Sequence, residues 1–384
     1  MIRCMLLCCL LSLSKLFAQP VFISGQTTGD YPYLDYGLGE DRLGGAKMTY
    51  LDTAVRVRVV DSVRSTYKVQ LSTNHFAYLP KQHFRRDTAV WKPYHLTGSW
   101  HVSGDDRYDY VKIGLDERLP YTSRQEISPS RIVVDIFGAT SNTNWVTQLK
   151  TVKEIKNVYH EQIDDDVFRV IIELQHPTHW GHSVYYEGRR LVVRIKQQPK
   201  SLKLKNLKIA IDAGHGGSNT GARGLQTGIL EKDYTLLMAK ALQEELTKKD
   251  AEVFMTRSTD TTLSMNERLA LVQGAQPDLL ISIHLNSSGR ATVKGTSTYY
   301  RYIGFRPLST AVLNEMYKLD LADFGNIGSF NFTLNGATDF PNTLVEVAFL
   351  SNAEDEARIR DEKFQRNVGR QIRKGIEQWL KSIR

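Results

Sequence analysis

Two histidines and two glutamates occupy positions in the last half of the chain where their side chains could meet. His215 follows the apolar stretch KIAID, His284 ends LLISIH, and Glu346 lies within TLVEVAF. Each stretch is typical of a buried strand, and open α/β sheets bind ligands outside the carboxyl ends of their strands. Glu231 begins a predicted helix after a glycine-rich loop, so that loop can bring its carboxylate back to His215. The spacing therefore predicts one site.

The residue types in this group favour a metal ion. Two neutral imidazoles and one carboxylate form the open three-ligand set of catalytic zinc, which leaves a fourth position for water. Manganese and iron accept the same donors and stay open as alternatives. Either histidine alone is better explained as a hydrogen-bonded structural residue, but the three residues together favour a metal. We therefore predict His215, Glu231 and His284 as ligands of Zn²⁺.

Glu346 is expected to act on the proton of a water molecule. A carboxylate in an otherwise apolar strand is costly to bury unless a partner compensates it. Zinc lowers the pKa of its water to about 7, and a nearby carboxylate can then serve as general base. The structural alternative is a salt bridge from Glu346 to Arg257 or Arg268.

The four residues lie in a series of motifs that resembles a known enzyme family. Residues 207–381 are similar to the zinc-dependent N-acetylmuramoyl-L-alanine amidases of the bacterial cell wall, through the stretches IDAGHGGSNTGARG, LEKDYTL, VFMTRSTDTTLSMNERL, LLISIHLNS, GTSTYY and LVEVAFLSN. The resemblance implies that His215, Glu231 and His284 bind zinc and that Glu346 is catalytic. It also implies hydrolysis of the amide between N-acetylmuramic acid and L-alanine of peptidoglycan.

Two details refine this resemblance, and two other functions stay open beside it. Leu285 replaces a small residue of the family and predicts a narrower cleft floor. The segment of chain between Tyr300 and Val345 is short, so we expect no inhibitory helix over the site.

The alternative functions are a zinc peptidase acting on peptidoglycan stem peptides and a non-catalytic protein that binds the wall or activates a partner.

The elements that must position this site are predicted as an α/β fold. Over residues 205–384, strands alternate with helices, which favours a mostly parallel twisted sheet flanked by helices, preceded by all-β modules. Residues 40–90 resemble a small Src-homology-like β-barrel, and residues 20–39 are expected to be a linker. Residues 95–198 resemble an AMIN domain with a β-sandwich fold, because 110–138 and 168–197 repeat one pattern. His176, His179 and His182 are expected in a wet surface turn rather than at a metal.

Composition and the first residues narrow the location and the partners. The 384 residues are 41% hydrophobic and 24% charged, as in soluble globular proteins. Residues 1–18 are typical of a signal peptide and predict a periplasmic or secreted protein. They hold all three cysteines, so the mature chain has no disulfide or thiolate ligand.

The charge distribution separates the possible partners. Removing Arg3 and Lys15 with residues 1–18 lowers the net charge from +8 to +6 (8 − 2), and no basic run is present. No nucleic-acid partner is therefore expected. No apolar run is long enough for a transmembrane anchor. Peptidoglycan is the expected substrate, and a divisome or activator protein is a compatible partner.

Overall fold

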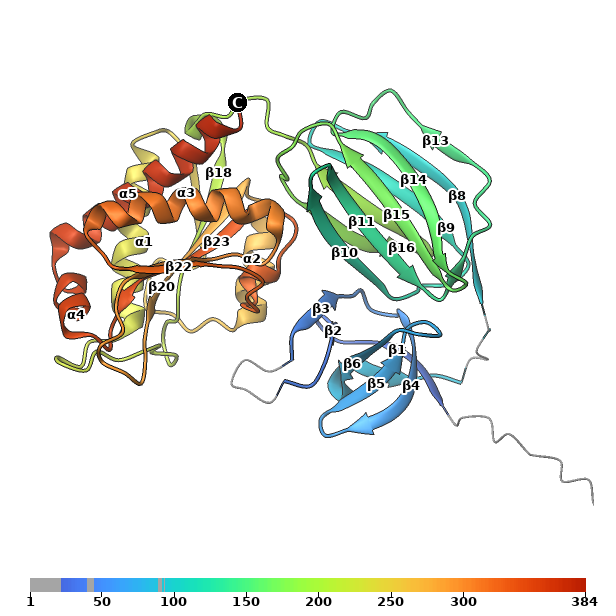
Figure 1. Ribbon diagram of the computed structural model, residues 1–384, viewed down its shortest axis with the longest axis horizontal. Coiled ribbons are helices and arrows are strands. Elements are labelled where there is room, and N and C mark those ends of the chain that lie inside the picture. Colours follow the sequence, from blue (N-terminus) through green and yellow to red (C-terminus); the bar gives the residue numbers. More distant parts are fainter. Residues whose placement is uncertain (1–21, 40–44, 89–91, 93) are drawn as a thin grey trace, which may run out of the picture.

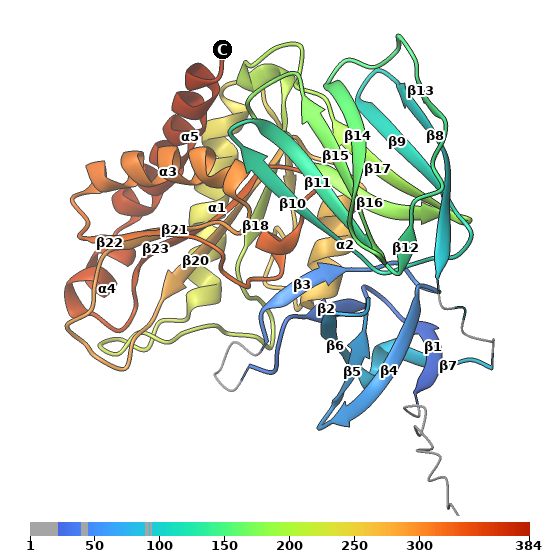
Figure 2. The same ribbon diagram turned by 45° about the vertical axis from the view of Figure 1, so that its right-hand side comes forward.

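The computed structural model describes residues 22–39, 45–88, 92 and 94–384, so the predicted signal peptide lies outside the described residues. Figures 1 and 2 show a β-sandwich (teal to green) beside an α/β region (yellow to red), with an N-terminal sheet (blue) below the sandwich. Within the described residues, no helix combines the length and the apolar character that a membrane crossing requires.

The N-terminal sheet has seven strands in the order β3-β2-β6-β5-β4-β1-β7. They are β1 (Ile23–Thr27), β2 (Tyr33–Asp35), β3 (Lys47–Tyr50), β4 (Arg56–Val63), β5 (Thr66–Gln70), β6 (Phe76–Pro80) and β7 (Phe84–Arg86). Alternation along β4 places Val57 and Val59 in the core. The predicted linker over 20–39 is wrong in its described part, because β1 pairs with β4 and β7 and β2 pairs with β3 and β6. Gly25 lies in β1 and Tyr33 in β2, and tyrosine is a residue that strands favour.

The β-sandwich packs the four-stranded sheet β10-β11-β15-β14 against the sheet β12-β8-β9-β17-β16, with β13 paired to β8. Its strands are β8 (His95–Gly104), β9 (Tyr108–Leu115), β10 (Tyr121–Ile127), β11 (Ser130–Phe137), β12 (Ala139–Thr140), β13 (Val146–Gln148), β14 (Ile155–Asp164), β15 (Val167–Leu174), β16 (His182–Glu187) and β17 (Arg190–Lys196). The sequence repeat has a structural counterpart. β9 is followed by the hairpin β10–β11 in the opposite sheet, and β15 is followed by the hairpin β16–β17 in the opposite sheet.

The α/β region contains one six-stranded sheet in the order β19-β18-β20-β23-β21-β22. Its strands are β18 (Lys208–Ala213), β19 (Glu252–Met255), β20 (Leu279–Asn286), β21 (Thr296–Tyr299), β22 (Asp323–Ile327) and β23 (Asn342–Phe349). Its α-helices are α1 (Glu231–Thr247), α2 (Met265–Ala275), α3 (Arg306–Met316), α4 (Ala353–Ile359) and α5 (Glu362–Ser382).

The sheet was predicted to be mostly parallel, and the structure shows it as a mixed sheet. β19, β18, β20 and β23 run parallel, but β21 is antiparallel to β23 and β22 follows the direction of β21. The chain between β20 and β21 contains no helix, so it turns back instead of crossing over to a parallel strand. The stretch STAVLNEMYKLDLADF (309–324) predicts a single helix, but α3 ends at Met316 and β22 begins at Asp323.

Alternation along the central strands gives the sheet two different faces. Ile283 and Val345 lie in the core with residues of α1, α3 and α5. His284 and Glu346 are the next residues along their strands and point to the other face, which α2 partly covers. The α-helix between Tyr300 and Val345 is α3, which packs with α5 on the face away from His284.

Candidate metal centre

The glycine-rich loop after β18 lets three side chains approach each other closely. A Cβ atom on Gly214 would collide with the His284 ring, and one on Gly221 would collide with the carboxylate of Glu231. His215 itself has a φ of 60°, a left-handed conformation in which L-residues are uncommon. The loop then returns to Glu231, the first residue of α1, as the sequence predicted.

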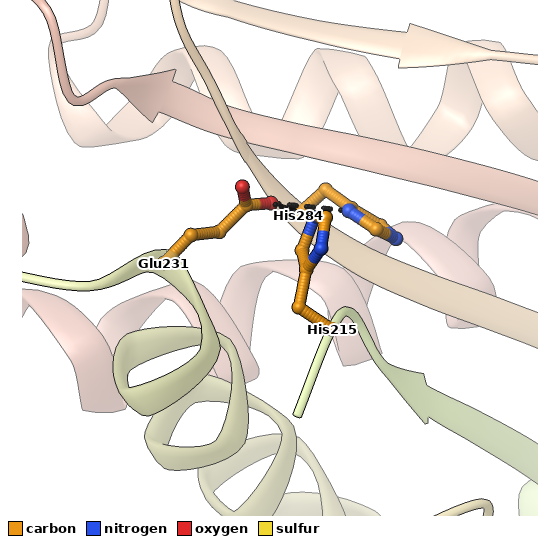
Figure 3. A group of neighbouring side chains, drawn as sticks. All are labelled: His215, Glu231 and His284. Atoms are coloured by element: carbon orange, nitrogen blue, oxygen red, sulfur yellow. Dashed lines mark hydrogen bonds and ion pairs between the residues drawn. The ribbon is translucent and has the colours of Figure 1, made fainter. Parts of the chain in front are cut away.

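Figure 3 shows that His215, Glu231 and His284 point toward one another from the loop, α1 and β20. His215 Nε2 lies 3.0 Å from Glu231 Oε1, and His284 Nδ1 lies 3.1 Å from the same oxygen. One donor atom from each residue lies within 4.8 Å of the others. The two imidazoles are 23% and 20% exposed, so solvent and a substrate can reach them. The structure therefore brings the three predicted ligands together.

The donor set fits a zinc ion by its chemistry and by its hydrogen bonds. Zinc holds nitrogen and carboxylate ligands at about 2.0–2.2 Å, so donors a few ångströms apart can share one ion. His215 Nδ1 donates to Asn219 Oδ1 at 2.9 Å, which leaves Nε2 for a metal. Burial alone would raise the pKa of Glu231, but hydrogen bonds from His215 and His284 lower it below the usual value. The carboxylate is thus ionised, as a cation requires.

Glu231 is also held by the backbone on both of its oxygens. Ala222 N donates to Oε2 at 2.7 Å, and Leu285 N donates to Oε1 at 3.0 Å. The Leu285 side chain packs in the core with α1 and α5 on the opposite face of the sheet. The expectation that this leucine narrows the floor of the site is therefore wrong, because alternation along β20 turns it away from His284.

Glu346 stands next to His284 in the register of β20 and β23. It is 8% exposed, and within the described part of the chain its Oε2 has no hydrogen-bond partner. Burial raises the pKa of Glu346 well above its usual value, and the negative charge of Glu231 raises it further. A buried carboxylate without a structural partner is what a proton-transfer role predicts.

The two arginines that offered a structural explanation for Glu346 are engaged elsewhere. Arg268 pairs with Asp212 at 2.6 Å and also donates to the backbone oxygen of His215. Arg257 donates to the carbonyl oxygens of Ala213, at 2.9 Å, and Gly214. Both side chains therefore fix the backbone around the first predicted ligand. Sequence reasoning missed this role, although Arg268 lies in the quoted stretch SMNERL.

The histidines at 176, 179 and 182 do not form a second site of this kind. His179 and His182 are buried, which corrects the expectation of a wet surface turn. His179 Nε2 lies 2.9 Å from Glu126 O, and His182 Nε2 lies 2.9 Å from Ser123 Oγ. Burial lowers the pKa of His179 to about 4 and that of His182 to about 3, so both are neutral. The three-residue spacing carried no information about burial.

Comparison with known proteins agrees with the geometry. The family model for N-acetylmuramoyl-L-alanine amidases matches residues 209–378, and the AMIN domain model matches residues 101–197. The uncharacterized protein YqiI of Bacillus subtilis (strain 168) is 32% identical over 44% of this chain and 84% of its own. The N-acetylmuramoyl-L-alanine amidase LytC of the same organism is 32% identical over 44% of this chain and 34% of its own.

One solved structure is similar to this chain over about the same share of its length. The N-acetylmuramoyl-L-alanine amidase from Clostridium difficile 630 is 32% identical and covers 46% of this chain and 97% of its own, with a TM-score of 0.44. This chain spans only about a third of LytC but most of YqiI. The matched stretch contains all four residues of the site. The chain therefore belongs to the N-acetylmuramoyl-L-alanine amidase family.

Proposed function

We propose that residues 205–384 hydrolyse the amide that joins the lactyl group of N-acetylmuramic acid to L-alanine, with His215, Glu231 and His284 holding zinc. The observation that carries this proposal is the convergence of three donors within 4.8 Å beside Glu346, whose Oε2 has no partner in the described residues. When bound, zinc polarises the amide carbonyl and lowers the pKa of water.

The protein's own residues then supply binding and proton transfer. Glu346 accepts the proton of the attacking water and passes it to the nitrogen of the leaving L-alanine, so one carboxylate serves as base and then as acid. The position of Glu346 beside His284 in neighbouring strands suits this transfer. Asn219 holds the ring of His215, and the Leu285 and Ala222 amides hold Glu231.

The bond that is cut distinguishes this proposal from the two alternatives. Purified full-length protein is incubated with peptidoglycan sacculi, and the products are identified by mass spectrometry. The amidase releases stem peptides that begin with L-alanine and leaves glycan strands without peptide. A zinc peptidase leaves L-alanine attached to the sugar, and a non-catalytic wall-binding protein leaves the sacculi intact, so either result would overturn the proposal.

We further propose that the protein acts outside the cytoplasm, where peptidoglycan lies. The AMIN match and the family support this location, and residues 1–18 would direct export. We also propose that the chain is divided into modules at 40–90, 95–198 and 205–384, with β1 and β2 extending the first of them to Ile23. Export is checked by sequencing the N-terminus of the cell-envelope protein, which is expected to begin at Gln19. An unprocessed N-terminus would contradict the signal peptide.

A further inference from the structure

One side of the predicted site is formed by β21 and carries an aromatic side chain. In the antiparallel pair of β21 and β23, Ser297 lies opposite Glu346 and Tyr299 lies opposite Leu344. Opposed residues share a face, and so do residues two apart along a strand, so the side chains of Tyr299 and Glu346 point to the same face. Tyr299 therefore lies beside the predicted general base on the side away from His284.

Two phenylalanines from a later segment cover Tyr299. The ring centroids of Phe330 and Phe332 lie 4.9 Å and 5.5 Å from that of Tyr299, and 4.4 Å from each other. Tyr299 is 5% exposed, whereas both phenylalanines are half-buried and reach the surface. Residues 328–333, with the sequence GSFNFT, are named here the aromatic segment, and they contain no ionisable side chain. The aromatic segment on this side of Glu346 thus carries no charge of its own, and the neighbouring Arg301 guanidinium is hydrogen-bonded to Asn331 Oδ1 and Lys47 O.

The N-terminal sheet holds the aromatic segment through Asn331, the residue between the two phenylalanines. Asn331 Nδ2 donates to Gly45 O at 2.9 Å, and Asn331 Oδ1 accepts from Lys47 N at 3.4 Å. Arg301 Nη1 donates to the same Oδ1 at 3.3 Å, and Arg301 Nη2 donates to Lys47 O. Ser329 has a φ of 58°, so the segment turns sharply just before this contact. The N-terminal sheet, which is the part of the chain farthest in sequence from Glu346, therefore holds the aromatic segment beside Glu346.

We infer that Phe330 and Phe332, which pack on the buried Tyr299, bind the saccharide part of the peptidoglycan substrate beside Glu346, and that the N-terminal sheet positions them through Asn331. This inference rests on the proposed amidase function. Aromatic rings pack against the apolar patch of C–H groups on one face of a pyranose ring, whereas the carboxylates of a stem peptide need cationic or donor partners. The aromatic segment offers rings without charge, which favours a sugar over the peptide.

The inference is tested by comparing two substrates that contain the same amide bond between a lactyl group and L-alanine. One is a glycan strand that carries stem peptides, and the other is a lactyl-L-alanyl peptide without sugar. Phe330→Ala and Phe332→Ala are expected to raise the KM for the glycan about tenfold relative to the KM for the sugarless amide. Phe76→Ala removes an exposed aromatic ring from β6 of the N-terminal sheet and serves as the matched control, with an unchanged ratio. An unchanged ratio in both phenylalanine variants would overturn the inference.

The role of the N-terminal sheet is tested at Asn331. Asn331→Ala removes the side chain that joins the aromatic segment to β3 and is expected to raise the same KM ratio with kcat less affected. Lys47→Met is the control, because it removes an ammonium that lies over the rings of Tyr33 and Tyr50 but keeps the backbone contacts to Asn331. Bound zinc and melting temperature are measured in each variant to verify folding.

The outcomes separate this inference from the proposed function. If the unaltered protein releases no stem peptides from sacculi, the proposed function fails. If it does release them but Asn331→Ala behaves as Lys47→Met does, only the positioning by the N-terminal sheet fails. A KM effect of equal size on both substrates would assign the aromatic segment to the peptide side and contradict a saccharide subsite.

Discussion

At the scale of single residues, two buried carboxylates on the strands that flank β20 have opposite environments. Asp212 accepts from Arg268 Nη1 at 2.6 Å, from Thr256 Oγ1 at 2.8 Å and from Ser282 Oγ at 2.7 Å. Burial alone would raise the pKa of Asp212, but the charge of Arg268 lowers it below the usual value. Within the described residues Glu346 Oε2 has no hydrogen-bond partner, and the pKa of Glu346 is raised. The first carboxylate supports the structure, whereas the second is the one proposed for proton transfer.

This difference predicts that Glu346→Gln stabilises the metal-free protein at neutral pH. The folded-state pKa of Glu346 is raised, so ionisation in the fold costs stability above the ordinary carboxyl range. The variant should therefore gain free energy of unfolding at about pH 8 but not at about pH 4, where the glutamate is protonated or nearly so in both states. Denaturant titrations at the two pH values measure this. A wild-type protein that is as stable as the Glu346→Gln variant at about pH 8, or more stable, would contradict the raised pKa of Glu346.

Arg268 is predicted to support both the fold and the metal. Arg268→Ala leaves Asp212 buried without its cationic partner, which should cost about 3–5 kcal/mol of stability. It also frees the backbone oxygen of His215, so zinc affinity should fall. Urea unfolding and competition with a chelator measure the two effects. Arg290→Ala is the control, because Arg290 is exposed and forms no salt bridge within the described residues. Equal results for both variants would contradict the role of Arg268.

The sequence predicted the four residues of the site better than the contacts that hold them. His215, His284 and Glu346 were recognised because polar residues at the ends of apolar strands stand out, and Glu231 because a helix start follows the loop. Asn219, Arg257 and Arg268 lie in the same motifs, but their roles depend on which loops fold against each other. Alternation alone could have shown that Leu285 points away from His284.

At the scale of elements, the loop between β18 and α1 sets the geometry of the predicted ligands. It begins after Ala213 and ends at Glu231. It folds back on itself, so that Ala222 N donates to the Glu231 carboxylate. Its glycines provide both space and positive φ angles. Strand directions were harder to predict, since an apolar run indicates a buried strand but not its orientation. The reversal at β21 matters because it places Tyr299 beside Glu346.

Gly221→Ala is predicted to damage the site while leaving the sheet intact. Gly221 has a φ of 67°, and an added Cβ would collide with the Glu231 carboxylate. Zinc affinity should fall about 10–100-fold, as for other contacts that orient a ligand. Gly289→Ala is the matched control, because a Cβ there has no neighbour within 4 Å. Titration with a zinc-binding dye compares them, and equal affinities would contradict the predicted role of this loop.

At the scale of the whole molecule, hydrogen bonds and a pair of packed tryptophans join the β-sandwich to the α/β region. His182 N donates to Thr338 O at 2.7 Å, and Gly304 N donates to Gln125 Oε1 at 2.9 Å. Trp180 packs on Trp379 of α5 with ring centroids 5.1 Å apart. The sequence showed the sandwich through its repeat, but these contacts join residues far apart in the chain and follow no periodicity.

Trp180→Ala is therefore expected to uncouple the two regions. Loss of the buried indole should cost about 3–5 kcal/mol, and one calorimetric transition should divide into two. Trp145→Ala is the control, because Trp145 belongs to the same sandwich but is 68% exposed. A single unchanged transition in Trp180→Ala would show that the contact does not join the regions.

The most direct test of the central claim measures bound zinc and stem-peptide release together in the Glu346→Gln protein. We expect about one zinc per chain, as in the unaltered protein, with release of stem peptides from sacculi reduced about 10²–10⁴-fold. Full release by this variant, or loss of its zinc, would contradict the separation of metal binding by His215, Glu231 and His284 from proton transfer by Glu346.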